Sequence, residues 1–371
     1  MHSRRRPRVG HSPGRGPCIH PWIRGLALVA FSGASLLGVM LGAGCADGTD
    51  RGSSGVGEVD PATQAGGTLS GEPARLLSEL EGLSFVPEGR TFIGSALDVG
   101  SSVDLLVDRF EVHSALWGAW TPATNPIPIE YRPDFLRPDL RPGPEAWTEE
   151  VPAVGMTLAE ARAFAERRAM RLLTFEEWLW CAVGPTCRRV PAGRRQRGFA
   201  NTLDTELYKS TPVGSFESGQ TPETAIYDML GNVWEWIEPP PERLRSNWTV
   251  YNDSAMDSEL GFSASTWVLG GSFMTPEGPL YTRDLLLLAL AVTRGHRSSE
   301  IGLRCCVDAD VYLAALPSGA RLSGRAQGRL EAVGARWGLR ATGLLDELLE
   351  SRPRHPWLTM LRRGAGRETN R

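Results

Sequence analysis

The stretch YDMLGNVWEW, residues 227–236, combines a turn signal with unusual aromatic bulk. The Gly-Asn pair at 231–232 favours a tight turn, and Trp234 and Trp236 flank the carboxylate of Glu235. Two interpretations are open. The stretch can form a tight turn whose tryptophans enter the core while the glutamate is solvated or paired with a base. It can also form a loop that holds a metal ion through its oxygen atoms.

The composition is that of an ordinary folded protein. The chain has 371 residues, of which 41% are hydrophobic and 22% charged, and its formal net charge is -3. This length allows one large domain or two small ones. Nothing in the charge balance indicates nucleic-acid binding, because such proteins neutralise phosphates with an excess of lysine and arginine.

The first 45 residues have the layout of an export signal. Residues 1–25 are rich in arginine, proline and glycine, residues 26–44 form an uncharged apolar run, and Cys45 follows in LGAGC. This layout resembles a bacterial lipoprotein signal, which is cut before its cysteine and acylated on it. An uncleaved membrane anchor and a cleaved signal peptide are the alternatives. All three interpretations place the body outside the cytoplasm, and a lipid on Cys45 would attach it to a membrane on the periplasmic or cell-surface side.

Composition divides the rest of the chain into three parts. Residues 46–75 are rich in glycine, serine, threonine and proline, which predicts a flexible tether. Residues 76–310 form the main domain, with capping-box signals at 157–160 and 174–177 ahead of two predicted helices. Residues 311–371 are basic and rich in leucine, alanine and arginine, which predicts a helical C-terminal extension or a frayed tail.

Several motifs, all in one order, resemble the sulfatase-modifying-factor family, whose best-known members are formylglycine-generating enzymes. They are FVPEGRTFIGS (85–95), VDRFEVHSALWGAW (107–120), PAVGMTLAEARAFAERRAMRLLTFEEWLWCA (152–182), STPVGSF (210–216), IYDMLGNVWEW (226–236), VLGGSF (268–273) and IGLRC (301–305). Leu173 replaces the proline of the family's Arg-Leu-Pro-Thr turn. The resemblance covers roughly residues 83–308. It implies a compact α+β fold that is rich in loops and related to C-type lectins.

The resemblance also implies that the Gly-Asn-Val-Trp-Glu-Trp stretch wraps a structural calcium ion. The implied ligands are the side-chain oxygens of Asn232 and Glu235 and the backbone carbonyl of Val233, a mixture of oxygen donors that calcium prefers. The family's other calcium loop would fall near Asn201. The chain is short there and lacks the usual Asp-Gly-aromatic step, so no second ion is expected.

The copper site of formylglycine-generating enzymes has no counterpart in this sequence. In the family, two cysteines spaced C-x4-C lie between the GGSF and GFRC strands, and soft thiolates favour copper(I). Residues 274–302 contain no cysteine. We therefore expect neither copper nor oxidase chemistry and assign no catalytic residue. The alternatives are a formylglycine-generating enzyme that uses Cys305 and Cys306, and another oxidoreductase acting on a protein or small molecule.

Four cysteines lie outside the leader, and an exported chain could join them in two disulfides. The family resemblance implies a Cys181–Cys305 bridge, because a cysteine near the end of the second helix is bonded to the one in the closing strand. Cys187 would then pair with Cys306. Four buried thiols, or a vicinal bond between Cys305 and Cys306, are the alternatives.

Together these features predict an exported lipoprotein whose sulfatase-modifying-factor-like domain has lost oxidase chemistry. Such a domain would act as a binding or assembly module of the cell envelope, because a rigid core can present variable loops to a ligand. The expected partners are the membrane and an envelope protein, peptide or glycan.

Overall fold

The computed structural model describes seven segments of the chain, which belong to one structural unit. They are residues 73–93, 97–121, 150–183, 199–239, 265–276, 289–319 and 321–367. Cys45 and Cys187 lie outside these segments, as do the predicted leader and nearly all of the predicted tether. Within these segments, no helix has the length and apolar character needed to cross a membrane.

Two sheets and a hairpin form the strand framework. The first sheet is antiparallel, in the order β1 (Leu83–Val86), β4 (Leu105–Asp108), β10 (Cys305–Asp308) and β5 (Arg171–Leu172). The second sheet has the order β8 (Ala289–Thr293), β7 (Ser265–Leu269), β6 (Trp234–Trp236) and β9 (Ile301–Leu303). Its β6–β9 pair is parallel and its other pairs are antiparallel. The hairpin joins β2 (Gly89–Ile93) to β3 (Leu97–Ser101).

Arg304 is the single residue between β9 and β10, so it lies where the chain passes from the second sheet to the first. Its side chain is completely buried. A charged side chain is tolerated there only if every donor finds an acceptor. This requirement shapes the site described below.

The helices of the main domain are α1 (Pro73–Glu81), α2 (Ser114–Trp120), α4 (Leu158–Arg167) and α5 (Phe175–Val183), with short 3-10 turns η6 (Leu203–Thr205) and η7 (Glu217–Gly219). Two of these helices, α4 and α5, begin where the sequence predicts them, whereas α1 begins inside the predicted tether. Thr157 and Glu160 form a reciprocal capping box at the start of α4. Thr174 and Glu177 exchange the same pair of hydrogen bonds at the start of α5. Both predicted capping boxes are confirmed.

The C-terminal residues form four α-helices and a 3-10 turn. They are α9 (Ala309–Ala314), α10 (Gly324–Trp337), η10 (Gly338–Ala341), α11 (Thr342–Ser351) and α12 (Pro356–Ala365). Helices α10 and α12 cross at two glycines: a Cβ on Gly334 would lie 2.0 Å from the carbonyl oxygen of Leu361, and one on Gly364 would lie 2.0 Å from that of Glu331. Only glycine permits this approach.

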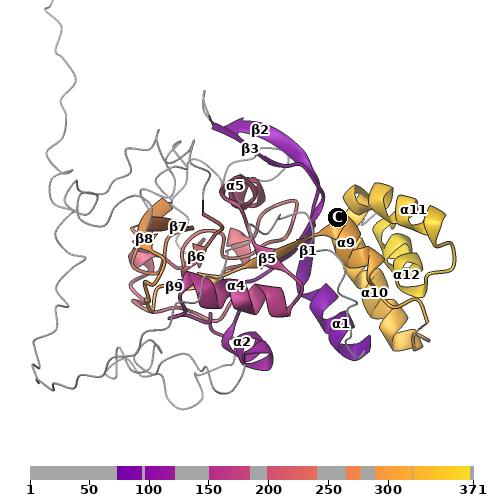
Figure 1. Ribbon diagram of the computed structural model, residues 1–371, viewed down its shortest axis with the longest axis horizontal. Helices are drawn as coiled ribbons and strands as arrows, with labels where there is room; N and C mark the ends of the chain where they lie inside the picture. The colour runs from indigo at the N-terminus through magenta and orange to yellow at the C-terminus, as the bar shows by residue number, and fades with distance from the viewer. Residues whose placement is uncertain are drawn as a thin grey trace, which may run out of the picture. The chain divides into compact units, whose positions relative to one another are not determined.

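These C-terminal helices pack against α1 and β1 (Figure 1). The indole of Trp337 donates to the carbonyl oxygen of Leu83 at 3.0 Å, and Arg336 donates to the same oxygen at 3.0 Å. Trp337, Trp357 and Phe85 belong to one continuous apolar cluster. The predicted helical extension therefore shares its core with the main domain.

Candidate functional site

The Gly-Asn turn of the opening motif depends on backbone conformations that few residues adopt. Gly231 and Asn232 have φ values of 77° and 59°, in the left-handed region that glycine and asparagine tolerate best. A Cβ on Gly231 would lie only 2.3 Å from the carbonyl oxygen of Asn201. The turn thus brings its backbone against the 201 loop, where the Asn232 amide donates to that same oxygen at 2.7 Å.

The side chain of Asn232 is saturated with protein contacts. Its Oδ1 accepts from the Thr211 amide at 2.9 Å and from Nδ2 of Asn201 at 3.0 Å. Its Nδ2 donates to Oε2 of Glu111 at 2.5 Å, and the other oxygen of Glu111 accepts from the Val233 amide at 3.1 Å. Glu111 and Asn232 therefore tie the turn to the segment after β4 through fully buried hydrogen bonds.

Glu235 pairs with Arg304. Its Oε1 lies 2.7 Å from Nη2 of Arg304, and the indole of Trp178 donates to Oε2 at 2.7 Å. The guanidinium also donates to the carbonyl oxygens of Asp108 and Tyr227, both at 2.8 Å. Both partners are essentially inaccessible to solvent, at 1% exposure for the glutamate and 0% for the arginine. The glutamate between the two tryptophans is therefore one half of a buried ion pair.

The buried polar groups around Arg304 include more carboxylates than cations. Glu111 and Asp228 lie close enough to Arg304 and Glu235 to interact with them electrostatically. Burial, followed by repulsion from Asp228 and Glu235, raises the pKa of Glu111 well above its usual range. Burial also raises the pKa of Asp228 to about 6, although the Gly214 amide, which donates to Oδ2 at 2.6 Å, lowers it. The folded state therefore holds protons on these two groups more tightly than the unfolded chain does.

The two side chains among the predicted calcium ligands, those of Asn232 and Glu235, are engaged by protein donors in this geometry. The Asn232 Oδ1 faces N–H donors, and both oxygens of Glu235 are engaged by Arg304 and Trp178. The Arg304 guanidinium occupies the position that a metal cation bound to Glu235 would take. In the segments that the structure describes, no group of three or more His, Cys, Asp and Glu residues could hold a metal ion. Calcium binding stays a prediction, and these contacts argue against it.

Replacing Asp228 with asparagine is expected to stabilise the protein at pH 8 and to leave it unchanged near pH 3. The folded pKa of about 6 exceeds the ordinary 3.8, so the folded state holds the proton more tightly. Stability contributed by this proton is lost as the pH rises from 3.8 to about 6, at a cost of roughly 3 kcal/mol. Asparagine keeps an acceptor for Gly214 and tolerates the φ of 56° at this position.

Urea unfolding of both proteins at pH 3 and pH 8, with and without a calcium chelator, measures this difference. A variant that is less stable than the parent at pH 8 would show that the charged carboxylate is favoured in the folded state. Destabilisation of the parent by the chelator would support the calcium prediction.

The cysteines of β10 face opposite sides of the first sheet. Cys305 packs in the cluster that contains Phe85 and Trp337, whereas Cys306 packs in the second cluster, which contains Cys181. All three are free, buried thiols. The predicted Cys181–Cys305 disulfide is therefore wrong, because successive strand residues alternate in direction and place Cys306, not Cys305, on the side of Cys181. The predicted partner of Cys306, Cys187, lies outside the described residues.

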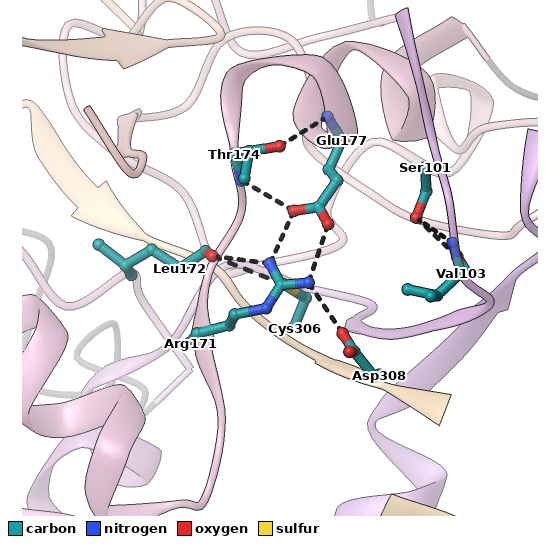
Figure 2. A network of polar contacts seen from close by, with 8 residues as sticks. All are labelled: Ser101, Val103, Arg171, Leu172, Thr174, Glu177, Cys306 and Asp308. Carbon is teal, nitrogen blue, oxygen red and sulfur yellow. Dashed lines mark hydrogen bonds and ion pairs between the residues drawn. The ribbon is translucent and has the colours of Figure 1, made fainter. Parts of the chain in front are cut away.

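Cys306 lies beside an arginine that joins three elements of the structure (Figure 2). The Arg171 guanidinium binds both oxygens of Glu177, at 2.7 and 2.8 Å, and reaches Asp308 at 2.9 Å. It also lies 3.2 Å from the Cys306 sulfur. Burial still raises the pKa of the Cys306 thiol well above its usual range, and burial raises that of Cys305 too. Both groups therefore stay protonated and unreactive at neutral pH.

Sequence reasoning missed the residues that complete this site. Glu111 and Arg304 lie in the quoted EVHSALW and GLRC motifs, but their pairing across the fold has no signature in sequence spacing. Asp228 precedes the turn by only a few residues. The available signal was chemical: a glutamate held between core tryptophans requires a buried cation, and the closing motif contains one.

The buried turn, together with the two sheets and the strands that close them, leads to the family of this domain. The chain belongs to the family of sulfatase-modifying factor enzyme 1-like domains, whose model matches residues 76–309. This membership and the mixed helix–sheet structure confirm the predicted α+β, formylglycine-generating-enzyme-like fold.

The curated relatives align with only part of the chain. Inactive C-alpha-formylglycine-generating enzyme 2 of Mus musculus is 27% identical over 170 residues, which are 43% of this chain and 50% of that protein. This chain thus spans about half the length of the curated relatives it matches. Treponema denticola variable protein 1 superposes with a TM-score of 0.43 and 15% identity, over 61% of this chain and 94% of that one. PvdO from Pseudomonas aeruginosa superposes with a TM-score of 0.44 and 18% identity, over 60% of this chain and 93% of that one.

Proposed function

We propose that this protein is an exported lipoprotein whose formylglycine-generating-enzyme-like domain binds or assembles components of the cell envelope and does not oxidise cysteine. One observation carries the second half of this proposal. Cys305 and Cys306, the one adjacent thiol pair in the sequence, enter different core clusters and stay protonated. A copper(I) site needs two thiolates that converge on the metal.

Two further features support a non-catalytic role. Residues 274–302, where the family's enzymes carry their copper ligands, contain no cysteine. The described part of that stretch holds Thr275, whose hydroxyl accepts from the Ser272 amide at 2.9 Å and so stabilises a turn. The curated relative from mouse is itself named inactive. A rigid core that presents loops is suited to ligand binding.

Titration with copper(I) in competition with a chromogenic chelator tests the absence of the oxidase site. We expect the chain to take no copper from the chelator, and a Cys305→Ser, Cys306→Ser variant to behave identically. Tight binding of one copper ion that this variant loses would contradict the proposal and favour a formylglycine-generating enzyme.

The anchoring half of the proposal rests on Cys45 and the apolar run before it. Cells grown with a labelled fatty acid should incorporate the label into the parent protein and not into a Cys45→Ser variant. Equal incorporation into both proteins would remove the lipoprotein assignment, while the copper experiment would still decide the chemistry.

A further inference from the structure

A groove of 1190 Å³ lies where the C-terminal helices meet the strand framework. One wall comes from two turns, β1–β2 with Glu88 and β3–β4 with Asp104. The other wall comes from α9 with Asp310 and from α11 with Glu347. The second wall begins one residue beyond the end of the family match at residue 309. One wall of the groove thus lies within the matched family region and the other lies beyond it.

The charges around the groove are predominantly negative and uncompensated. Its four carboxylates form no salt bridge to any residue of the described segments; they are those of Glu88, Asp104, Asp310 and Glu347. Burial raises the pKa of Asp104, the Glu88 amide, which donates to Oδ1 at 2.7 Å, lowers it, and the charges of Glu88 and Asp310 raise it. Asp104 therefore lies close enough to both of these carboxylates to be repelled by them.

The two arginines of the groove have other partners. Arg340 lies 3.8 Å from Glu223, which is not part of the groove, and Arg352 donates to the carbonyl oxygen of Ala314. Their charges leave the four carboxylates without a direct counter-ion. A ligand that carries several positive charges would supply the counter-ions that the described residues do not.

Between the carboxylates the groove is aliphatic. Its apolar side chains come from the same elements as its charges; they are Val103, Val311, Leu344 and Leu348. Val311 is 41% exposed, which is high for a valine and leaves its methyl groups available for contact. Aliphatic surface between separated carboxylates matches a chain that alternates basic and apolar side chains.

Other classes of ligand fit this groove less well. An anionic lipid surface or a nucleic acid would be repelled by the four carboxylates. A single metal ion needs three or more converging ligands, and no such group of His, Cys, Asp and Glu exists in the part of the chain that the structure covers. The carboxylates come from four separate elements, so they match spaced positive charges and not one point charge.

We propose that this groove binds an extended segment of a partner protein in which arginine or lysine side chains alternate with aliphatic ones. The basic side chains would pair with the carboxylates on the two walls, and the aliphatic ones would contact Val311 and the leucines of α11. This inference rests on the proposed binding function and names the chemical class of its ligand.

Fluorescence anisotropy with the full chain tests the proposal. The probe is a short fluorescein-labelled peptide of alternating arginine and leucine, and the comparison peptide replaces arginine with glutamate. We expect saturable binding of the first peptide alone, weakened by added salt. Glu347→Lys should weaken it about tenfold, because a favourable charge is replaced by a repulsive one. Val311→Ser should weaken it severalfold through lost aliphatic contact.

Glu350→Lys is the matched control, since Glu350 is an exposed acidic residue of α11 that does not line the groove. It should leave the affinity unchanged. Failure of the peptide to bind, or equal losses for Glu347→Lys and Glu350→Lys, would overturn the groove as its site. Spermine and the unlabelled peptide should also be compared as competitors of the labelled peptide. If spermine competes at a similar concentration, the groove binds small polycations without selecting a peptide, and the proposal is overturned.

The two proposals fail separately. Catalytic oxidation of a cysteine peptide by the chain would overturn the proposed function and leave the groove's affinity for basic peptides intact. Loss of peptide binding alone would overturn the groove and leave the non-catalytic domain in place.

Discussion

Replacing Arg304 with methionine is expected to lower the free energy of unfolding by about 3–5 kcal/mol, because it leaves a buried carboxylate without its partner. Glu235 would keep only the Trp178 indole as a donor, and the carbonyl oxygens of Asp108 and Tyr227 would lose theirs. The electrostatic interaction of Arg304 with Glu111 and Asp228 would be lost as well. Urea unfolding at pH 7 measures the loss.

Arg329→Met provides the matched control, because Arg329 forms an ion pair with Glu81 in which both side chains are more than a third exposed, at 39% and 34%. Solvent screens an exposed pair of this kind, so we expect only a small change in stability. Adding Glu235→Gln to Arg304→Met should recover part of the lost stability, since it removes the unpaired charge. Equal effects of the two arginine substitutions would contradict the assignment of Arg304 as the internal cation of the site.

Replacing Trp337 with alanine is expected to lower the free energy of unfolding by about 3–5 kcal/mol, the usual cost of a large cavity in a core. The ring is 1% exposed, contacts Phe85 with centroids 6.1 Å apart, and donates to the carbonyl oxygen of Leu83. The substitution therefore removes a bond and a contact between the C-terminal helices and β1. Thermal or urea unfolding should show one shifted transition, since both parts share the core.

Leu339→Ala is the control for this prediction, because Leu339 is 64% exposed only two residues away. Exposed substitutions of this kind change stability by about 0.5 kcal/mol or less. A Trp337→Ala protein that unfolds in two separate transitions, with the main domain unchanged, would show that the C-terminal helices form an independent appendage.

Local signals in the sequence predicted local structure well. Thr157 and Glu160 cap their helix as expected because a capping box is complete within four residues. The family motifs indicated the α+β fold, and the family match over residues 76–309 confirms it. The tight turn at Gly231 and Asn232 follows from residues that tolerate positive φ.

Long-range pairing was not predictable from the same signals. Glu235 and Arg304 are 69 residues apart, and nothing in either motif specifies that they meet. The structure does not contain the predicted Cys181–Cys305 disulfide, because alternation along β10 places Cys305 on the side of the sheet away from Cys181. The role of the C-terminal helices depends on close contacts at Gly334 and Gly364, which composition alone does not reveal.

Turnover of a cysteine-containing sulfatase peptide, followed by mass spectrometry in the presence of copper and oxygen, tests the central claim most directly. A formylglycine-generating enzyme converts the peptide's thiol to an aldehyde. We predict that the full chain forms no more aldehyde than a reaction without protein, because its two adjacent thiols are buried on opposite faces of β10. Copper-dependent formation of the aldehyde, abolished by Cys305→Ser or Cys306→Ser, would contradict it.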